Sequence, residues 1–187
     1  MADEFVDVLD EHGVLTGQQI LKSVAHQDGI WHLGAHVWIY NDKGELLLQK
    51  RAATKLLYPG LWDISAAGHV AAGEDPSVSA ARELFEEIGK NVSLSQLRKQ
   101  FIIKVVHDVD GMRIREFCHV YTWYCNDDIA TFSRQEEEVD ELKFISLQQL
   151  KTDIDSFYVR NYVPHGEYYD RILAVIEEEL KQLKKII

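Results

Sequence analysis

The stretch from Asp75 to Gly89 constrains the fold of this chain more than any other. Asp75 can cap a helix, Pro76 suits a first helical turn, and Gly89 suits the position just past a helix end. We therefore expect a helix over residues 75–88. Its apolar residues recur at helical spacing and are expected to form a stripe that faces the core: Val78, Ala81, Phe85 and Ile88.

Carboxylates gather on the same helix. Glu83 and Glu87 are four residues apart and are expected on the side opposite the apolar stripe, with Glu86 beside them. Negative charges this close repel one another unless a cation lies among them. Mg²⁺ and Mn²⁺ suit this role, because hard cations take oxygen ligands and bridge carboxylates to phosphate oxygens. The alternative is a solvated acidic face on which Arg82 pairs with Glu86.

Composition limits the partners of the chain. Its 187 residues, 46% of them hydrophobic, are enough for one domain with a sizeable core, so we expect a single domain over 1–187. The net charge of −11 repels nucleic acid and anionic membranes, which excludes a polymeric nucleic acid substrate. A phosphate-bearing substrate would need local cations. The acidic start and the lack of a run of about 20 apolar residues predict a cytoplasmic protein without a membrane segment.

Strand and helix patterns alternate along the chain. An N-terminal hairpin is expected over 4–20, a main body over about 32–165, and an amphipathic C-terminal helix over about 168–187. Within the body, turn residues 41–44 join two strands into an antiparallel pair. This pattern predicts the α/β class. The expected strands of the body are 35–40, 45–50, 64–69, 101–106, 115–124 and 141–145.

The spacing around the acidic helix resembles the Nudix box, G-x₅-E-x₇-R-E-U-x-E-E-x-G-U, in which U is a bulky apolar residue. Lys90 departs from it at the last position. The resemblance implies an α/β/α sandwich with a mixed central sheet, and a loop, helix and loop that hold one to three divalent ions. It implies Glu83, Glu86 and Glu87 as metal ligands, with Glu74 and Arg82 ordering the loop. The matching residues are Gly68, Glu74, Arg82, Glu83, Glu86, Glu87 and Gly89.

Nudix proteins usually hydrolyse a nucleoside diphosphate linked to another group, by attack of a metal-activated water on phosphorus. The resemblance therefore predicts a metal-dependent pyrophosphohydrolase that cleaves a diphosphate linkage in a small substrate, with Mg²⁺ or Mn²⁺ as its cofactor. Glu86 and Glu87 are predicted to take part in catalysis, together with Glu116 on a later strand. The general base stays open between Glu116 and the acidic run 136–138.

A narrower resemblance points to the Nudix-fold isopentenyl-diphosphate isomerases and the hydrolases related to them. That isomerase uses a cysteine where this chain has Ala67 and a second carboxylate where it has Ile114, so hydrolysis is favoured. The interval from His26 to His32 is also one residue shorter than in the isomerase. The segments that carry the resemblance are Thr16-Gly17, His26, His32, 49–52, Lys55, 58–69 and Glu116.

The same branch implies that Arg51 and Lys55 contact the diphosphate, which would supply the local positive charge. Two alternatives to hydrolysis stay open: isomerase-like activity, and a non-catalytic Nudix module that senses a ligand. The histidines also stay open, because His26, His32 and His69 can form a second metal site or simply bond backbone carbonyls. The sequence leaves undecided the substrate, the number of ions and the oligomeric state, with a homodimer among the options.

Overall fold

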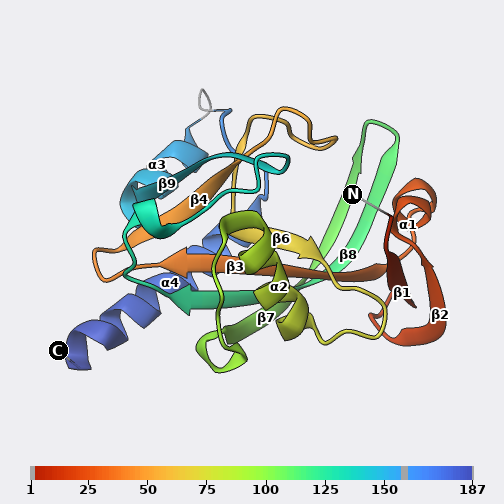
Figure 1. Ribbon diagram of the computed structural model, residues 1–187, viewed down its shortest axis with the longest axis horizontal. Coiled ribbons are helices and arrows are strands. Elements are labelled where there is room, and N and C mark those ends of the chain that lie inside the picture. The colour runs from red at the N-terminus through yellow and green to blue at the C-terminus, as the bar shows by residue number, and fades with distance from the viewer. Residues whose placement is uncertain (1–2, 157–159, 187) are drawn as a thin grey trace.

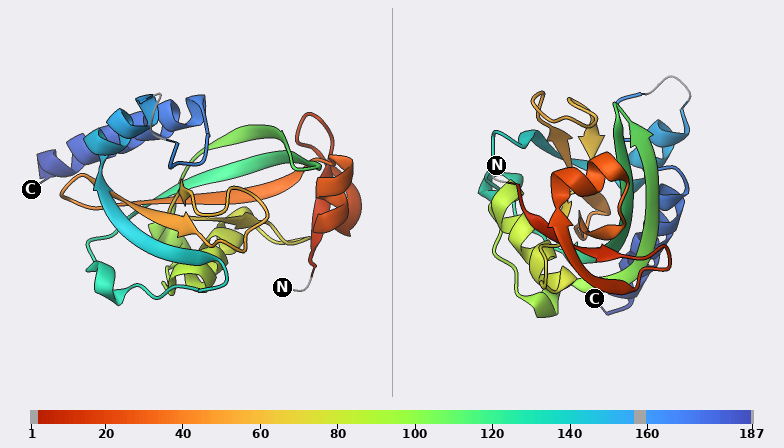
Figure 2. Two further views of the ribbon diagram at one scale, coloured as in Figure 1. Left: turned by 90° about the horizontal axis from the view of Figure 1, so that it is seen from above. Right: turned by 90° about the vertical axis from the view of Figure 1, so that its right-hand side faces the viewer.

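The computed structural model describes residues 3–156 and 160–186, and it has three layers (Figure 1). A mixed seven-stranded sheet lies in the middle. Helix α2 (Pro76–Ile88) covers one face, and α3 (Leu147–Asp155) and α4 (Glu167–Ile186) lie on the other (Figure 2). The predicted α/β sandwich is confirmed. Each face of the sheet has its own apolar cluster, one around Leu84 of α2 and the other around Ile172 of α4.

The sheet divides at one end, and this division positions the site. Strands β3 (His32–Tyr40) and β4 (Glu45–Arg51) pair with each other only at two positions near their shared turn. Beyond that point β3 pairs with β6 (Ala66–His69) and β4 pairs with β5 (Trp62–Asp63), while β9 (Val139–Ser146) pairs with β4 along its whole length. Side chains of α2 and of the segment before α4 line one cavity at this end of the sheet.

The other edge of the sheet is a long antiparallel pair. Strand β8 (Met112–Tyr124) runs parallel to β3, with Glu116 beside His32, and β7 (Arg98–Val109) pairs with its outer edge. Side chains directly opposite on neighbouring strands share a face. The register therefore directs Glu116 and its neighbours on β3 toward the α4 side of the sheet.

The predicted N-terminal hairpin is present as β1 (Phe5–Leu9) and β2 (Leu15–Leu21). It is followed by the short helix α1 (Lys22–Asp28), which packs against β8 and was not expected from the sequence. Leu21 at its N-cap provides no side-chain hydrogen bond, so the usual start signal is missing. This helix carries His26 to the split end of the sheet.

Helix α2 begins and ends as predicted, and Ile88 and Ala81 pack in the core as expected, but the expected apolar stripe is wrong at Val78 and Phe85. Asp75 accepts a hydrogen bond from the Ser77 backbone N–H at 2.8 Å, and Gly89 ends the helix in the left-handed region at φ 70°. Val78 and Phe85 are 40% and 55% exposed. The buried face is instead formed by Ala80, Leu84, Glu87 and Ile88.

Because a different face of α2 is buried than expected, the box carboxylates also lie in a different position. Glu87 lies on the core-facing side of α2, and only 5% of it is exposed. Glu83, one turn earlier, lies beside it and is largely buried. The helix packs Ala80 and Leu84 against the sheet, and Glu87 on the same side contacts Gln49 of β4 and Ala67 of β6. The expectation that they lie opposite the core was therefore wrong.

The predicted C-terminal helix is present as α4 and covers the sheet through Ile172 and Ile176, which are fully buried. Residue 187, the expected last residue of this helix, lies outside the described residues. Helix α3 was not predicted; Ser146 caps it by accepting a hydrogen bond from the Gln149 backbone N–H. In the part of the chain that the structure describes, no helix is long and apolar enough to cross a membrane.

Candidate active site

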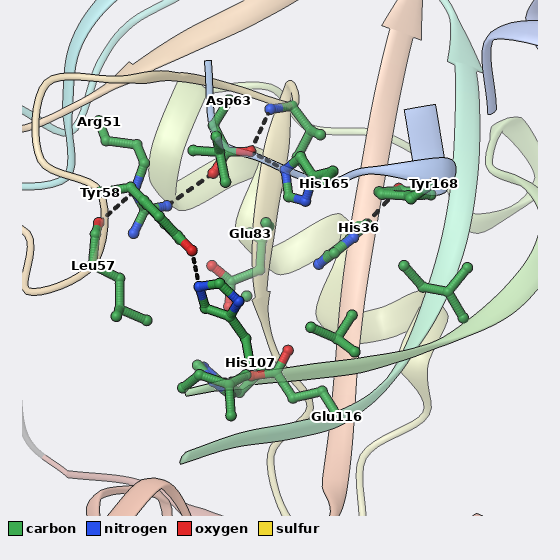
Figure 3. Close-up of a pocket in the computed structure, with 18 of the residues that line it drawn as sticks. His36, Arg51, Leu57, Tyr58, Asp63, Glu83, His107, Glu116, His165 and Tyr168 are labelled. Carbon is green, nitrogen blue, oxygen red and sulfur yellow. Dashed lines mark hydrogen bonds and ion pairs between the residues drawn. The ribbon is translucent and has the colours of Figure 1, made fainter. Parts of the chain in front are cut away.

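A cavity of about 850 Å³ opens at the split end of the sheet. Loops between β4 and β6, the pair β7–β8 and the segment before α4 form its walls (Figure 3). It brings together residues that are far apart in the sequence. The predicted site residues that line it are Arg51, Lys55, His69, Glu83, Glu86, Glu87 and Glu116.

The three box glutamates occupy different environments. Glu87 Oε2 accepts hydrogen bonds from Gln49 Nε2 at 3.0 Å and from the Ala67 backbone N–H at 3.1 Å. Glu83 Oε1 accepts one from Arg82 at 2.7 Å. Glu86 is 42% exposed and lies 3.2 Å from the same guanidinium group. One face of α2 thus presents two buried carboxylates and one at the rim.

Burial makes the two inner carboxylates costly to ionise. Burial raises the pKa of Glu83 to about 7, against the opposing effect of Arg82. Burial and the nearby Glu83 raise the pKa of Glu87 to about 8. Two carboxylates with raised pKa values and too few cations around them form a group that a divalent ion would stabilise.

Gly68 explains why the box begins with glycine. A Cβ atom at this position would lie 2.0 Å from Glu83 Cδ, so any side chain would displace the carboxylate. Arg82 holds the helix to the preceding loop by donating to the His69 carbonyl at 3.0 Å and lying 3.5 Å from Glu74 Oε2. Glu74 in turn accepts a hydrogen bond from the Ser79 hydroxyl. These contacts fix the carboxylates relative to β6.

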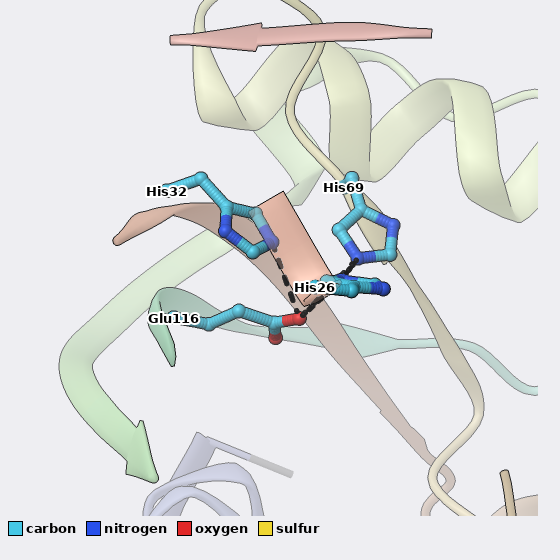
Figure 4. A group of neighbouring side chains, drawn as sticks. All are labelled: His26, His32, His69 and Glu116. Carbon is cyan, nitrogen blue, oxygen red and sulfur yellow. Dashed lines mark hydrogen bonds and ion pairs between the residues drawn. The ribbon is translucent and has the colours of Figure 1, made fainter. Parts of the chain in front are cut away.

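Three histidines and one glutamate converge beside this group (Figure 4). Glu116 Oε1 lies 3.7 Å from His26 Nε2, 3.5 Å from His32 Nε2 and 3.3 Å from His69 Nε2. The Nε2 atoms of His26 and His69 are 3.1 Å apart. His32 Nδ1 donates to the Ile30 carbonyl at 2.8 Å, which turns Nε2 inward.

The charge state of this His₃Glu cluster suits a metal ion. Burial lowers the pKa of His69, which favours the neutral ring. Burial would raise the pKa of Glu116, but the imidazoles of His26, His32 and His69 beside it hold that pKa well below its ordinary value. His32 Nε2 is buried and has no hydrogen-bond partner among the described residues. Imidazole nitrogens around an ionised carboxylate form a ligand set that suits a divalent cation.

The two predicted phosphate-binding cations are both paired with acids. Arg51 donates to Asp63 Oδ2 at 3.0 Å and to the Leu57 carbonyl at 2.8 Å, and 16% of its side chain is exposed. Lys55 pairs with Glu138, the member of the acidic run 136–138 that lines the cavity. Both cations lie in the cavity wall, so a diphosphate would meet them as part of ion pairs rather than as isolated charges.

The inner end of the cavity carries polar residues that the sequence analysis did not identify. His165 Nε2 lies 2.7 Å from Asp63 Oδ1, and His36 Nδ1 lies 3.3 Å from the Tyr168 hydroxyl. Burial would raise the pKa of Asp63, but His165 and Arg51 lower it well below its ordinary value. Asp63 and His165 are 102 residues apart, so no local pattern reveals their contact.

An aromatic contact closes one side of the cavity mouth. Tyr58, in the loop between β4 and β5, contacts His107 on β7 through its hydroxyl, and the two rings are 5.4 Å apart. Tyr58 has φ 50°, a conformation that a non-glycine residue rarely adopts. This contact joins the loop that carries Lys55 to the β7–β8 pair (Figure 3).

The family model for the NUDIX domain matches residues 30–165, and the chain belongs to the Nudix hydrolase family. It is 37% identical over 176 residues to Nudix hydrolase 3 of Arabidopsis thaliana, covering 90% of this chain and 23% of that protein. It is 33% identical to the isopentenyl-diphosphate Delta-isomerase of Corynebacterium diphtheriae, covering 79% of this chain and 81% of that one. The resemblance to both groups is thereby confirmed.

Solved structures agree on the fold. The crystal structure of DR0079 from Deinococcus radiodurans matches with a TM-score of 0.65 at 18% identity, covering 94% of this chain and 98% of that one. At this identity the match shows a shared fold and leaves the substrate undefined.

Proposed function

We propose that this chain is a metal-dependent hydrolase that cleaves the diphosphate linkage of a small organic diphosphate. One observation carries the proposal: the inner carboxylates Glu83 and Glu87 share a cavity with the ion-paired cations Arg51 and Lys55. Clustered carboxylates bind a divalent cation, and Arg and Lys side chains bind phosphate oxygens. A diphosphate bound with its metal ion would contact both the carboxylates and the basic side chains of the cavity.

The carboxylates fit a hard divalent ion such as Mg²⁺ or Mn²⁺. Glu83, Glu86 and Glu87 would hold it, and Gly68 leaves the space that Glu83 needs. When bound, the ion neutralises phosphate charge and lowers the pKa of water. We further propose that His26, His32, His69 and Glu116 form a second cation site, because their converging atoms include a buried nitrogen with no hydrogen-bond partner in the part of the chain that the structure describes.

The protein groups would then bind and orient the substrate. Arg51 is fixed by Asp63 and Leu57, so it can contact a phosphate oxygen without losing much side-chain freedom on binding. Arg82 orients both Glu83 and Glu86. Glu116 lies within the His₃Glu cluster, which favours a ligand role. Among the candidate bases of the acidic run, Glu138 is the one that reaches the cavity.

The geometry does not favour isomerisation. Ala67 provides no proton-transfer group at the position of the isomerase cysteine. Cys118 is buried with Sγ 3.3 Å from Glu116 Oε2, and burial raises its thiol pKa well above the ordinary value. It lies two residues from Glu116 on the same face of β8, so the two groups cannot flank a substrate from opposite sides.

The experiment is a panel of small organic diphosphates, including isopentenyl diphosphate, incubated with Mg²⁺ or Mn²⁺ and followed by released phosphate and product mass. We expect hydrolysis of at least one compound, its loss in excess EDTA, and its recovery when metal is restored. Glu137→Gln is the matched control for Glu87→Gln, because Glu137 is exposed and lies outside the cavity. Turnover that persists in EDTA, or conversion of isopentenyl diphosphate to dimethylallyl diphosphate without hydrolysis, would contradict the proposal.

A further inference from the structure

The imidazole of His36 presents one nitrogen to the inner end of the cavity. His36 is 8% exposed and lines the cavity from β3. The Tyr168 hydroxyl accepts a hydrogen bond from Trp38 Nε1 at 2.8 Å and lies 3.3 Å from His36 Nδ1. With Nδ1 occupied by this contact, Nε2 is the ring nitrogen left for a ligand. His36 Nε2 has no hydrogen-bond partner among the described residues, and Figure 3 shows the ring pointing into the cavity.

His165 provides the complementary group. Its Nε2 donates to Asp63 Oδ1 at 2.7 Å, and Asp63 is held in turn by Arg51 and by the Ile64 backbone N–H. The other ring nitrogen, Nδ1, has no hydrogen-bond partner among the residues that the structure describes. The ring centroids of His36 and His165 are 6.3 Å apart. One small polar group can therefore contact a nitrogen of each ring, and both rings are held from behind.

This pair lies next to the proposed diphosphate site. His36 is directly opposite Ala67 in the β3–β6 register, and the Ala67 backbone N–H donates to Glu87. A ring nitrogen of His36, a Glu116 oxygen and the Cys118 sulfur lie within 4.8 Å of one another. An organic group attached to a diphosphate bound beside Glu87 would lie in the same cavity as the two histidines.

We propose that His36 and His165 form a specificity subsite that selects a polar organic group able to hydrogen-bond to both rings, such as an amide, and rejects an apolar alkenyl chain. The inference rests on the proposed function, because it assumes that the diphosphate binds beside Glu87. An alkenyl chain placed here would desolvate both imidazoles without replacing their hydrogen bonds.

The test uses two ligands that differ only in polarity. The 3-amino-3-oxopropyl and 3-methylbut-3-enyl groups have the same branched shape, and methylene-bridged diphosphonates of both resist hydrolysis. Their dissociation constants are measured by calorimetry with Mg²⁺ present. We expect the amide ligand to bind at least about tenfold more tightly. Because no turnover is needed, a chain that binds this ligand but hydrolyses nothing would refute the proposed function and retain the subsite.

Three variants separate recognition from structure. His36→Phe should reduce the preference for the amide by about tenfold, and His36→Gln, which keeps an N–H near the Nε2 position, should restore part of it. His12→Phe is the matched control: His12 lies in the β1–β2 turn with 78% of its side chain exposed, and its replacement should leave the preference unchanged. Thermal unfolding confirms that each variant is folded.

Four results would overturn the inference. The first is equal or tighter binding of the alkenyl ligand by the wild-type chain. The second is binding of neither ligand. The third is an equal loss of affinity for both ligands in His36→Phe, which would assign His36 a structural role. If His36→Phe does not fold, His165→Phe provides the same comparison. The fourth result is a preference for the amide ligand that is unchanged in His165→Phe.

Discussion

Replacing Glu87 by Gln should stabilise the metal-free protein while removing its activity. Burial and Glu83 raise the pKa of Glu87 from 4.5 to about 8, so folding takes up a proton between these two values. The stability contributed by the protonated carboxyl is present below pH 4.5 and is lost as pH rises through 8. Between pH 4.5 and pH 7, a gap of roughly 2.5 pH units, the free energy of unfolding should fall by about 3 kcal/mol.

Glutamine at position 87 cannot ionise, so it avoids the cost of a buried charge, and it can keep the hydrogen bonds that Glu87 now accepts. Its carbonyl oxygen can accept the hydrogen bonds that Gln49 and the Ala67 backbone now donate to Oε2. The variant should therefore unfold roughly 5–10 °C higher than wild type in EDTA at about pH 7. At about pH 5, close to the unfolded-state pKa of 4.5, the raised pKa of Glu87 costs the folded protein little. The stability gain from Gln should therefore fall to about 1 kcal/mol.

The assay is thermal unfolding followed by circular dichroism, in EDTA and then in excess Mg²⁺. The ion should raise the melting temperature of wild type more than that of the variant, because Gln provides no charge to the ion. Glu137→Gln provides the baseline for a Glu-to-Gln change at an exposed site. A variant less stable than wild type in EDTA, or a stability gain equal at both pH values, would refute the reasoning.

Three further predictions follow from the cavity. Arg51→Ala should cost about 1–3 kcal/mol of stability by leaving buried Asp63 without its cation, and should also raise KM; an unchanged melting temperature would argue against the pair. Ala67→Cys should not convert isopentenyl diphosphate to dimethylallyl diphosphate, since apolar Ile114 stands where the isomerase has its second carboxylate; detectable isomer in a mass assay would contradict this. Glu116→Gln should weaken Mn²⁺ binding by roughly tenfold or more in a direct titration, and equal affinity would remove the second cation site.

The box helix shows how far sequence reasoning reaches. Its start at Asp75 and its end at Gly89 were predicted, because capping depends on residues within one turn of the helix. Its core-facing side was predicted only in part. Ile88 is buried as expected, but apolar Val78 and Phe85 are exposed, and the sheet contacts the face with Ala80 and Leu84. Which face is buried depends on the shape of the partner surface, which the helix sequence does not contain.

The site follows the same division. The sequence by itself determined the three box carboxylates and their spacing, since a four-residue interval places Glu83 beside Glu87 on any helix. Only the tertiary structure decided that His26 meets Glu116 and that His165 meets Asp63. Those contacts depend on strand register and on where a distant segment packs, so they arise from long-range geometry that local residue patterns do not encode.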